Sequence, residues 1–258
     1  MYKISKYHFK AAFSSIWVLL ILFIATPLSA QTNSVSSISD KIWLGIGGKS
    51  AWESSRYFSF SFTVINSGNK VFSRKHLWDR YSGDYRLQYM AKDSSSILVL
   101  FNTNTKKGKV FRNLAEIKDD SLSNIYLLKA YNSFVNDTYW LVMPAKIEDP
   151  GVILSALNDT LINNLFCSSL ALRFQNGIGN TSGDCYEIFL NQKNNEIIQW
   201  AYLLQGEKEK QFLNWSSYKN IGGLKLSLLK TSIDKKFAIS LEDAIILPTV
   251  STLLFFQP

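Results

Sequence analysis

The sequence predicts a mainly β protein with some α structure, a half-open antiparallel β-barrel that wraps one or two helices. Segments in which apolar and polar residues alternate recur after residue 56, and Gly, Asn, Asp and Ser separate them. The connections are short, which favours antiparallel pairing. Aromatic residues make up 14% of the chain, and many stand at alternating positions. This suits a curved sheet whose inner face is either filled or holds a ligand.

An export signal opens the chain. Lys3, Lys6 and Lys10 precede an uninterrupted apolar run of ten residues, 16–25, and Ala30 supplies the small residue that signal peptidase requires. We expect residues 1–30 to be a signal peptide cleaved near Ala30, and residues 31–258 to be a single domain in the periplasm. The signal carries three lysines and no acids, so the net charge falls from +8 to +5 on cleavage.

A short helix and a first strand follow the signal. Residues 40–48 have apolar side chains at helical spacing, with Asp40 as the N-terminal cap and Gly47 and Gly48 as the terminator. Residues 56–65 alternate strictly, which predicts a half-buried strand. Its aromatic face should point to the core or to a cavity.

A meander and a second helix come next. Strands are predicted at 71–81, 85–90, 96–102 and 109–113, with hairpin loops at 82–84 and 105–108. A helix should begin at 119–121 and run to Val135, and its apolar stripe should lie on the sheet. The stripe consists of Leu122, Ile125, Leu128, Tyr131 and Val135.

The stretch 136–152 is expected to combine a strand, a stop and a turn. Residues 139–143 are aromatic and β-branched, which favours a strand. Pro144 should end this strand, because proline has no backbone N–H to donate to a neighbouring strand. The loop 144–151 contains Asp149-Pro150-Gly151, a turn sequence. One interpretation is purely structural, and the other is that Trp140, Met143 and this loop border a ligand cavity.

The second half is interpreted as more sheet. A polar segment leads to strands at 165–174, 186–190, 197–205, 211–218, 224–231 and 237–247. The glycine-rich loop 176–184 resembles a phosphate cradle, but Asp184 and Cys185 follow it where a P-loop needs Lys-Ser/Thr and a helix.

Several chemistries find little support. Beyond residue 30 the chain has one histidine, His76, and no His-x-x-x-His or Cys-x-x-Cys spacing, so neither a metal site nor a cofactor is predicted. His76 should be a half-exposed residue on an alternating strand. A hydrolase stays an alternative because triad residues converge in space, although no Gly-x-Ser-x-Gly elbow appears. The scattered lysines lack a basic stripe interleaved with aromatics, so no nucleic acid is expected as a partner.

The two cysteines, Cys167 and Cys185, would be oxidised in an exported protein if they met. A hairpin that closes over residues 175–183 places Cys167 opposite residue 191, about six residues or roughly 20 Å from Cys185. That separation exceeds the reach of a disulfide. Either both thiols are free or the predicted register is wrong.

Two motifs carry a family resemblance. They are His76-Leu-Trp-Asp-Arg-Tyr-Ser-Gly-Asp-Tyr-Arg86 and Tyr139-Trp-Leu-Val-Met-Pro-Ala-Lys-Ile-Glu-Asp-Pro-Gly151. With the order of elements, they resemble a Bacteroidetes-type branch of the LolA-like superfamily of periplasmic lipoprotein carriers. The resemblance implies a non-enzymatic protein that binds an apolar or acylated ligand, in lipoprotein or lipid trafficking to the outer membrane. The alternatives are a periplasmic interaction protein without a ligand and a hydrolase.

The ligand, a lipid or the acyl chain of a lipoprotein, should bind in one apolar pocket under the helix of residues 121–135. Residues two apart on a strand share a side, and an irregular strand end before Pro144 would bring the last two residues to the same pocket. We also expect a monomer that contacts a membrane or membrane proteins transiently. The predicted ligand-binding residues are Phe58, Phe60, Phe62, Trp78, Trp140 and Met143.

Overall fold

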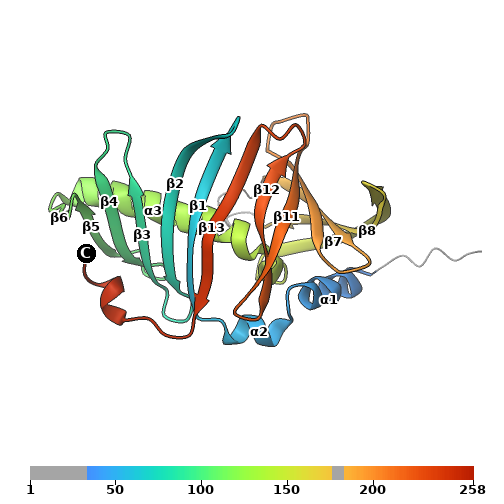
Figure 1. The fold of residues 1–258 in the computed structure, drawn as a ribbon, viewed down its shortest axis with the longest axis horizontal. Coiled ribbons are helices and arrows are strands. Elements are labelled where there is room, and N and C mark those ends of the chain that lie inside the picture. Colours follow the sequence, from blue (N-terminus) through green and yellow to red (C-terminus); the bar gives the residue numbers. More distant parts are fainter. Residues whose placement is uncertain (1–33, 176–182) are drawn as a thin grey trace, which may run out of the picture. The chain divides into compact units, whose positions relative to one another are not determined.

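Thirteen strands form one sheet in the described part of the chain (Figure 1). The computed structural model describes residues 34–175 and 183–258. The predicted signal peptide and most of the glycine-rich loop lie outside the described residues. Neighbouring strands pair antiparallel and the sheet is open, as predicted. The strands are β1 (Tyr57–Asn66), β2 (Asn69–Asp79), β3 (Asp84–Met90), β4 (Ser96–Asn102), β5 (Gly108–Arg112), β6 (Ala115–Glu116), β7 (Val152–Ile162), β8 (Leu165–Phe174), β9 (Cys185–Asn191), β10 (Ile197–Leu203), β11 (Gln211–Ile221), β12 (Leu224–Ser232) and β13 (Phe237–Leu247).

The strand order joins two meanders. It runs β6-β5-β4-β3-β2-β1-β13-β12-β11-β10-β9-β8-β7, so β1 pairs with both β2 and β13. The chain must therefore travel from one edge of the sheet, at β6, to the other, at β7. The helix α3 (Asp120–Val142) makes this crossing. Its 23 residues give it a length of about 34 Å, and Figure 1 shows it lying behind β2, β1 and β13.

The prediction of a strand at residues 139–143 was wrong. Residues 139–142 form the last turn of α3, and the 3-10 turn η1 (Met143–Lys146), with Pro144 near its start, follows directly. The aromatic and β-branched run has strand propensity, but Ala130, Asp137 and Leu141 recur at helical spacing and are buried against the sheet. Tertiary packing overrides local propensity here.

The predicted stripe of α3 does not lie on the sheet throughout. Leu122, Ile125 and Leu128 are 40%, 50% and 62% exposed. The helix carries apolar residues on two faces, and the face with Ala130, Phe134 and Leu141 packs on the core. The sequence pattern alone does not decide between two such faces.

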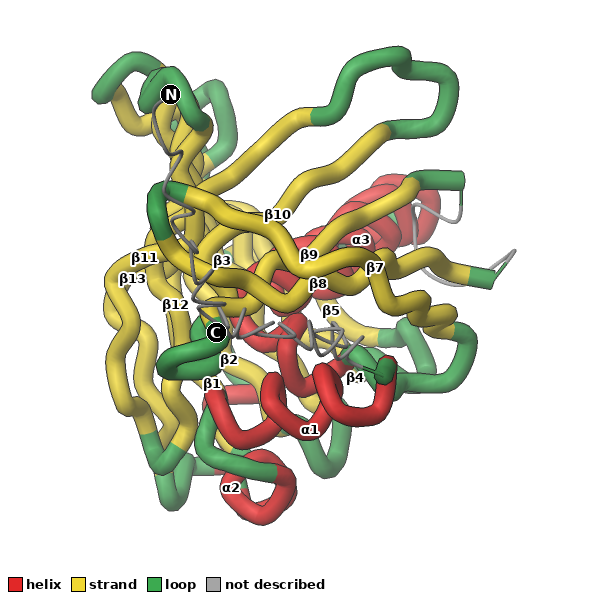
Figure 2. The backbone as a smooth tube through the Cα atoms, turned by 90° about the vertical axis from the view of Figure 1, so that its right-hand side faces the viewer, coloured by secondary structure: helices red, strands yellow, loops and turns green. Residues whose placement is uncertain are grey.

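Two short helices precede β1, and Figure 2 shows them at one end of the sheet. The helix α1 (Val35–Gly45) begins earlier than predicted, since Ser34, and not Asp40, is the N-cap and accepts a hydrogen bond from Ser37 N–H. The second helix, α2 (Lys49–Ser54), was not predicted. Gly47 has φ of +105° after α1, consistent with a glycine terminator.

The remaining strands lie close to the predicted ones. The bounds of β4, β8 and β13 are as predicted. The segment after Gly151, expected as a polar connection, is the edge strand β7, whose pairing with β8 shifts between Leu157 and Thr160. Its Asn158-Asp159 turn signal corresponds to this bulge. The two-residue strand β6 was also missed.

Two apolar clusters fill the helix-bearing face. The first packs α3 on β1 to β5 and on β11 to β13, and the second packs α1 and η1 on β8 to β11. Trp140 contacts both clusters. In the described part of the chain, helices fall short of the length and hydropathy that crossing a membrane requires.

Candidate binding cavity

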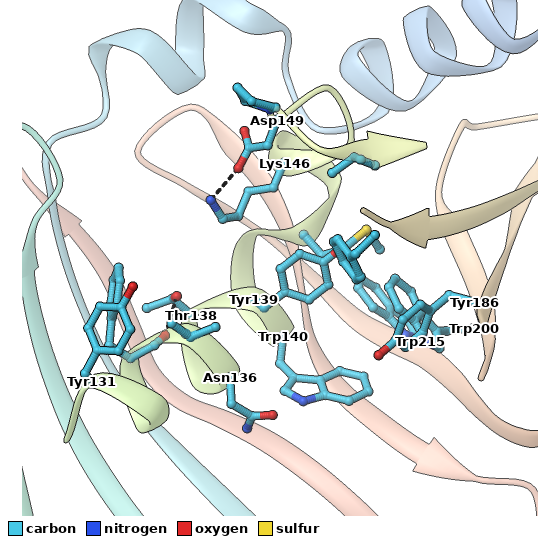
Figure 3. Close-up of a pocket in the computed structure, with 16 residues that line it drawn as sticks. Tyr131, Asn136, Thr138, Tyr139, Trp140, Lys146, Asp149, Tyr186, Trp200 and Trp215 are labelled. Carbon is cyan, nitrogen blue, oxygen red and sulfur yellow. Dashed lines mark hydrogen bonds and ion pairs between the residues drawn. The ribbon is translucent and has the colours of Figure 1, made fainter. Parts of the chain in front are cut away.

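A cavity of about 350 Å³ lies between the C-terminal half of α3, the turn after it and the strands β8 to β11 (Figure 3). Aromatic side chains dominate its wall. The lining residues are Tyr131, Phe134, Val135, Asn136, Thr138, Tyr139, Trp140, Met143, Lys146, Asp149, Pro150, Val152, Phe174, Tyr186, Trp200 and Trp215.

The aromatic residues of the cavity wall come from one side of α3 and from one face of the sheet. On α3, Tyr131, Val135 and Tyr139 stand four residues apart and therefore lie on one side of the helix. On β10 and β11, Trp200 and Trp215 point to the helix-bearing face, and their rings stack 5.9 Å apart at an interplanar angle of 10°. Elements far apart in the sequence thus meet at one aromatic surface.

Trp200 is the centre of this surface. Its ring centroid lies 5.1 Å from that of Tyr186, 6.0 Å from Trp140 and 6.1 Å from Tyr139. Phe174 contacts Tyr139 and Tyr186 in T-shaped arrangements. Aromatic faces and edges of this kind suit an apolar chain.

A pair of charged side chains stands at one side of the cavity. Lys146 Nζ donates a hydrogen bond to Asp149 Oδ2 at 2.6 Å, and both side chains are partly exposed (Figure 3). Burial raises the pKa of the Tyr139 hydroxyl well above its ordinary value, so this hydroxyl stays protonated even in alkaline solution.

The structure divides the predicted site residues into two groups. Trp140 and Met143 line the cavity, and because both belong to helical turns three residues apart they need no strand irregularity to face it. The other four are buried in the first apolar cluster and do not line this cavity; they are Phe58, Phe60, Phe62 and Trp78.

Sequence reasoning missed most of the aromatic wall. Tyr131 and Val135 already belong to the predicted apolar stripe, and continuing its helical spacing past Val135 would have found Tyr139. Trp200 and Trp215 could have been found only by their alternation on two strands.

His76 is buried, so the expectation of a half-exposed residue was wrong. Its ring stacks on Phe60 at 4.5 Å, and its Nδ1 is 2.7 Å from the hydroxyl of Tyr85. Its Nε2 lies 3.1 Å from Asp137 Oδ2, an electrostatic contact without the geometry of a hydrogen bond. The alternating pattern placed His76 on the core face of β2, beneath α3, which supplies Asp137.

Asp137 is the acceptor at the centre of this buried network. Arg74 donates to both of its oxygens, Nε to Oδ2 at 2.7 Å and Nη2 to Oδ1 at 2.8 Å. The cavity-lining Asn136 donates to Oδ1 at 2.8 Å. The ring nitrogens of His76 face Tyr85 and Asp137, so no serine occupies the position that a Ser-His-Asp triad needs. Among the described residues, no cluster of His, Cys, Asp and Glu could hold a metal ion.

The comparisons with known proteins show the fold. A DUF1329 family protein from Desulfovibrio piger superposes with a TM-score of 0.51 and 12% identity, covering 87% of this chain and 98% of its own. A LolA superfamily protein from Nitrosomonas europaea gives a TM-score of 0.51 and 10% identity, with the same coverage of 87% and 98%. No family model and no curated protein matches the chain. The fold is the LolA-like half-open barrel, as the sequence resemblance implied.

Proposed function

We propose that this protein binds an apolar or acylated ligand in the aromatic cavity. Eight aromatic side chains line a cavity of about 350 Å³ beside α3, and this concentration supports the proposal. Small-molecule pockets span roughly 300–1,000 Å³, so this cavity suits a single acyl chain better than a lipid with several chains. The LolA-like fold is compatible with such a ligand.

We propose that the protein carries this ligand in the periplasm. The lysine-flanked apolar run and Ala30 support export to the periplasm, with the mature chain starting at Gln31. We assign the chain to a Bacteroidetes-type branch that traffics lipoproteins or lipids to the outer membrane, as a monomer with transient membrane contact. N-terminal sequencing of the exported product tests the cleavage site, and a product that retains Met1 would contradict it.

Trp140 and Met143 are the proposed ligand contacts that were anticipated from the sequence. The other four, Phe58, Phe60, Phe62 and Trp78, would contact a longer chain only if α3 moved away from the sheet. The primary test therefore uses cavity residues outside the central core.

Filling the cavity is the sharpest test. Val135 is half-buried and lines the cavity, so Val135→Trp should abolish saturable binding of a fluorescent fatty-acid probe. Val71→Trp, at a position 60% exposed on β2, is the control and should bind as the wild type does. Thermal unfolding of both variants shows whether the fold is retained, because overpacking alone costs about 1–3 kcal/mol.

A second pair of variants lies on one strand. Phe174→Ala removes a ring from the cavity wall at the end of β8, whereas Phe166→Ala changes a ring that is 71% exposed on the same strand. Binding should weaken only in the first variant. Mass spectrometry of the natively purified protein should also find a retained lipid. If the wild type binds no probe and retains no lipid, the ligand proposal fails.

One observation favours a second candidate, a periplasmic interaction protein without a ligand. Leu122, Ile125 and Leu128 form an exposed apolar row on α3, and such rows often mark protein contacts. The matched change combines Ile125→Ser with Leu128→Ser, which makes this row polar without touching the cavity wall. This double variant should leave probe binding unchanged if the cavity is the functional site.

A further inference from the structure

A second groove, of about 460 Å³, lies on the face of the sheet opposite α3. Phe58 and Phe60 point to the helix-bearing face, so Ser59 between them points to the other, and the same alternation places Lys75 and Leu77 there. The segment after β13 forms the remaining wall. The lining residues are Ser59, Lys75, His76, Leu77, Arg86, Gln88, Leu247, Thr249, Val250, Ser251 and Leu254.

The C-terminal segment is fixed against the sheet. Phe255 is buried with Tyr57 and Leu77, and the rings of Tyr57 and Phe255 lie 6.5 Å apart. Arg86 Nη1 donates to the carbonyl oxygens of Leu254 at 2.9 Å and Gln257 at 2.8 Å. The groove therefore has two ordered walls: strands of the sheet form one, and the segment after β13 forms the other.

Two cations lie side by side in the groove. Lys75 on β2 pairs with Gln88 on β3, and Arg86 pairs with Leu77, so Lys75 and Arg86 are diagonal neighbours on one face of the sheet. Neither of them forms an ion pair among the described residues.

No acid of the groove balances this charge, since no acidic side chain lines it in the described ranges. Two acids that belong to β2 and β13 are engaged elsewhere: Asp79 binds Arg56, and Glu242 binds Lys70. The groove therefore keeps a net positive charge.

The neutral polar side chains have unused hydrogen-bonding capacity. Across residues 34–175 and 183–258, the side chains of Ser59, Gln88, Thr249 and Ser251 make no hydrogen bond with the protein. The Nε and Nη2 groups of Arg86 also have no protein acceptor there. Hydrogen-bond donors that line the same groove as two cations match the hydrogen-bonding needs of an oxyanion.

We propose that this groove binds a phosphate or carboxylate group, held by Lys75 Nζ, the free N–H groups of Arg86 and the surrounding hydroxyls. The aliphatic side chains of Leu77, Leu247 and Val250 continue the groove beside the cations, so an apolar substituent on the anion has a surface to contact. The site is separate from the aromatic cavity and its test does not depend on the proposed function.

The test uses inorganic phosphate and hexyl phosphate as probes in titration calorimetry at low salt. Wild-type protein should bind at least one probe saturably, and Lys75→Gln should weaken this binding by about tenfold, as expected for loss of a charge-assisted contact. Lys107→Gln, an equal change of charge in the β4–β5 hairpin, should bind as the wild type does. Lys75→Arg, which keeps the charge, should restore binding.

The two probes identify the source of the anion. Equal affinity for both indicates a free oxyanion, and tighter binding of hexyl phosphate indicates an amphiphile headgroup. Val135→Trp, which fills the aromatic cavity, should leave both affinities unchanged. Binding that is absent in the wild type, equal in Lys75→Gln and Lys107→Gln, or lost in Val135→Trp would overturn the proposal.

Discussion

At the scale of single residues, His76 couples stability to pH. Burial lowers the pKa of its imidazole, and the nearby Asp137 carboxylate offsets only part of this effect. The folded pKa thus lies below the value of 6.5 in the unfolded chain. Below that value the unfolded state binds a proton that the folded state does not, so stability falls as pH falls.

We therefore expect the free energy of unfolding to decrease between about pH 7 and pH 5.5, with a slope of at most about 1.4 kcal/mol per pH unit. Urea denaturation at several pH values measures this slope. His76→Gln should lose most of the slope, because His76 is the only histidine after residue 30 and carboxylates with lowered pKa titrate at lower pH. An identical slope in both proteins would contradict the assignment.

At the scale of elements, α3 shows which side of a helix is buried. Leu141 is 3% exposed and packs in the first apolar cluster, near the end of the helix, whereas Leu128 is on its outer side. Leu141→Ala should lower the free energy of unfolding by about 3 kcal/mol, because it leaves a cavity. Leu128→Ala should change it by less than about 0.5 kcal/mol. Equal effects in denaturant titrations would mean that the helix faces the sheet differently.

The β8–β9 hairpin decides the state of the cysteines. Cys167 pairs with Asn191, as the sequence predicted, and Cys185 pairs with Arg173, so the two thiols are free. Cys167 and Arg173, the partner of Cys185, are six residues apart on β8, so the two cysteines lie roughly 20 Å from each other along the strands.

The unfolded, unreduced protein should accordingly take up two alkyl groups in intact-mass measurement. In the folded protein Cys185 should react before Cys167, whose thiol is buried and has a pKa raised by that burial. A mass lower by two hydrogens, with no labelling, would show a disulfide and refute this register.

At the scale of the whole molecule, the two meanders share one sheet. In the described residues, the two meanders are joined through the β1–β13 pairing and through Trp140, which contacts both apolar clusters. We therefore expect one cooperative unfolding transition.

Substitutions in each meander test this expectation. Leu87→Ala in β3 and Ile188→Ala in β9 both remove buried side chains and should each lower stability by about 2–4 kcal/mol. Both should shift the same transition, whether followed by tryptophan fluorescence or by circular dichroism. Two transitions, of which each variant moves only one, would show that the meanders unfold separately.

Most strands of the sheet could be predicted from local sequence patterns. Period-2 alternation and turn residues placed β1 to β5 and β8 to β13, because a strand with one buried face must alternate. The same logic put Phe58, Phe60 and Phe62 on one side and predicted the pairing of Cys167 with residue 191. It failed at the edge strand β7, whose exposed side chains leave little alternation to detect.

The conformation of residues 139–143 and the cavity beside α3 depend on packing between elements that are distant in the sequence. Residues 139–143 could form either a strand or a helical turn, and the free energy of burying Leu141 and Val142 between α3 and the sheet selected the helix. The cavity joins Trp140 on that helix with Trp200 and Trp215 on two strands. These three residues come together because of the order of strands in the sheet, and local sequence patterns contain no information about that order.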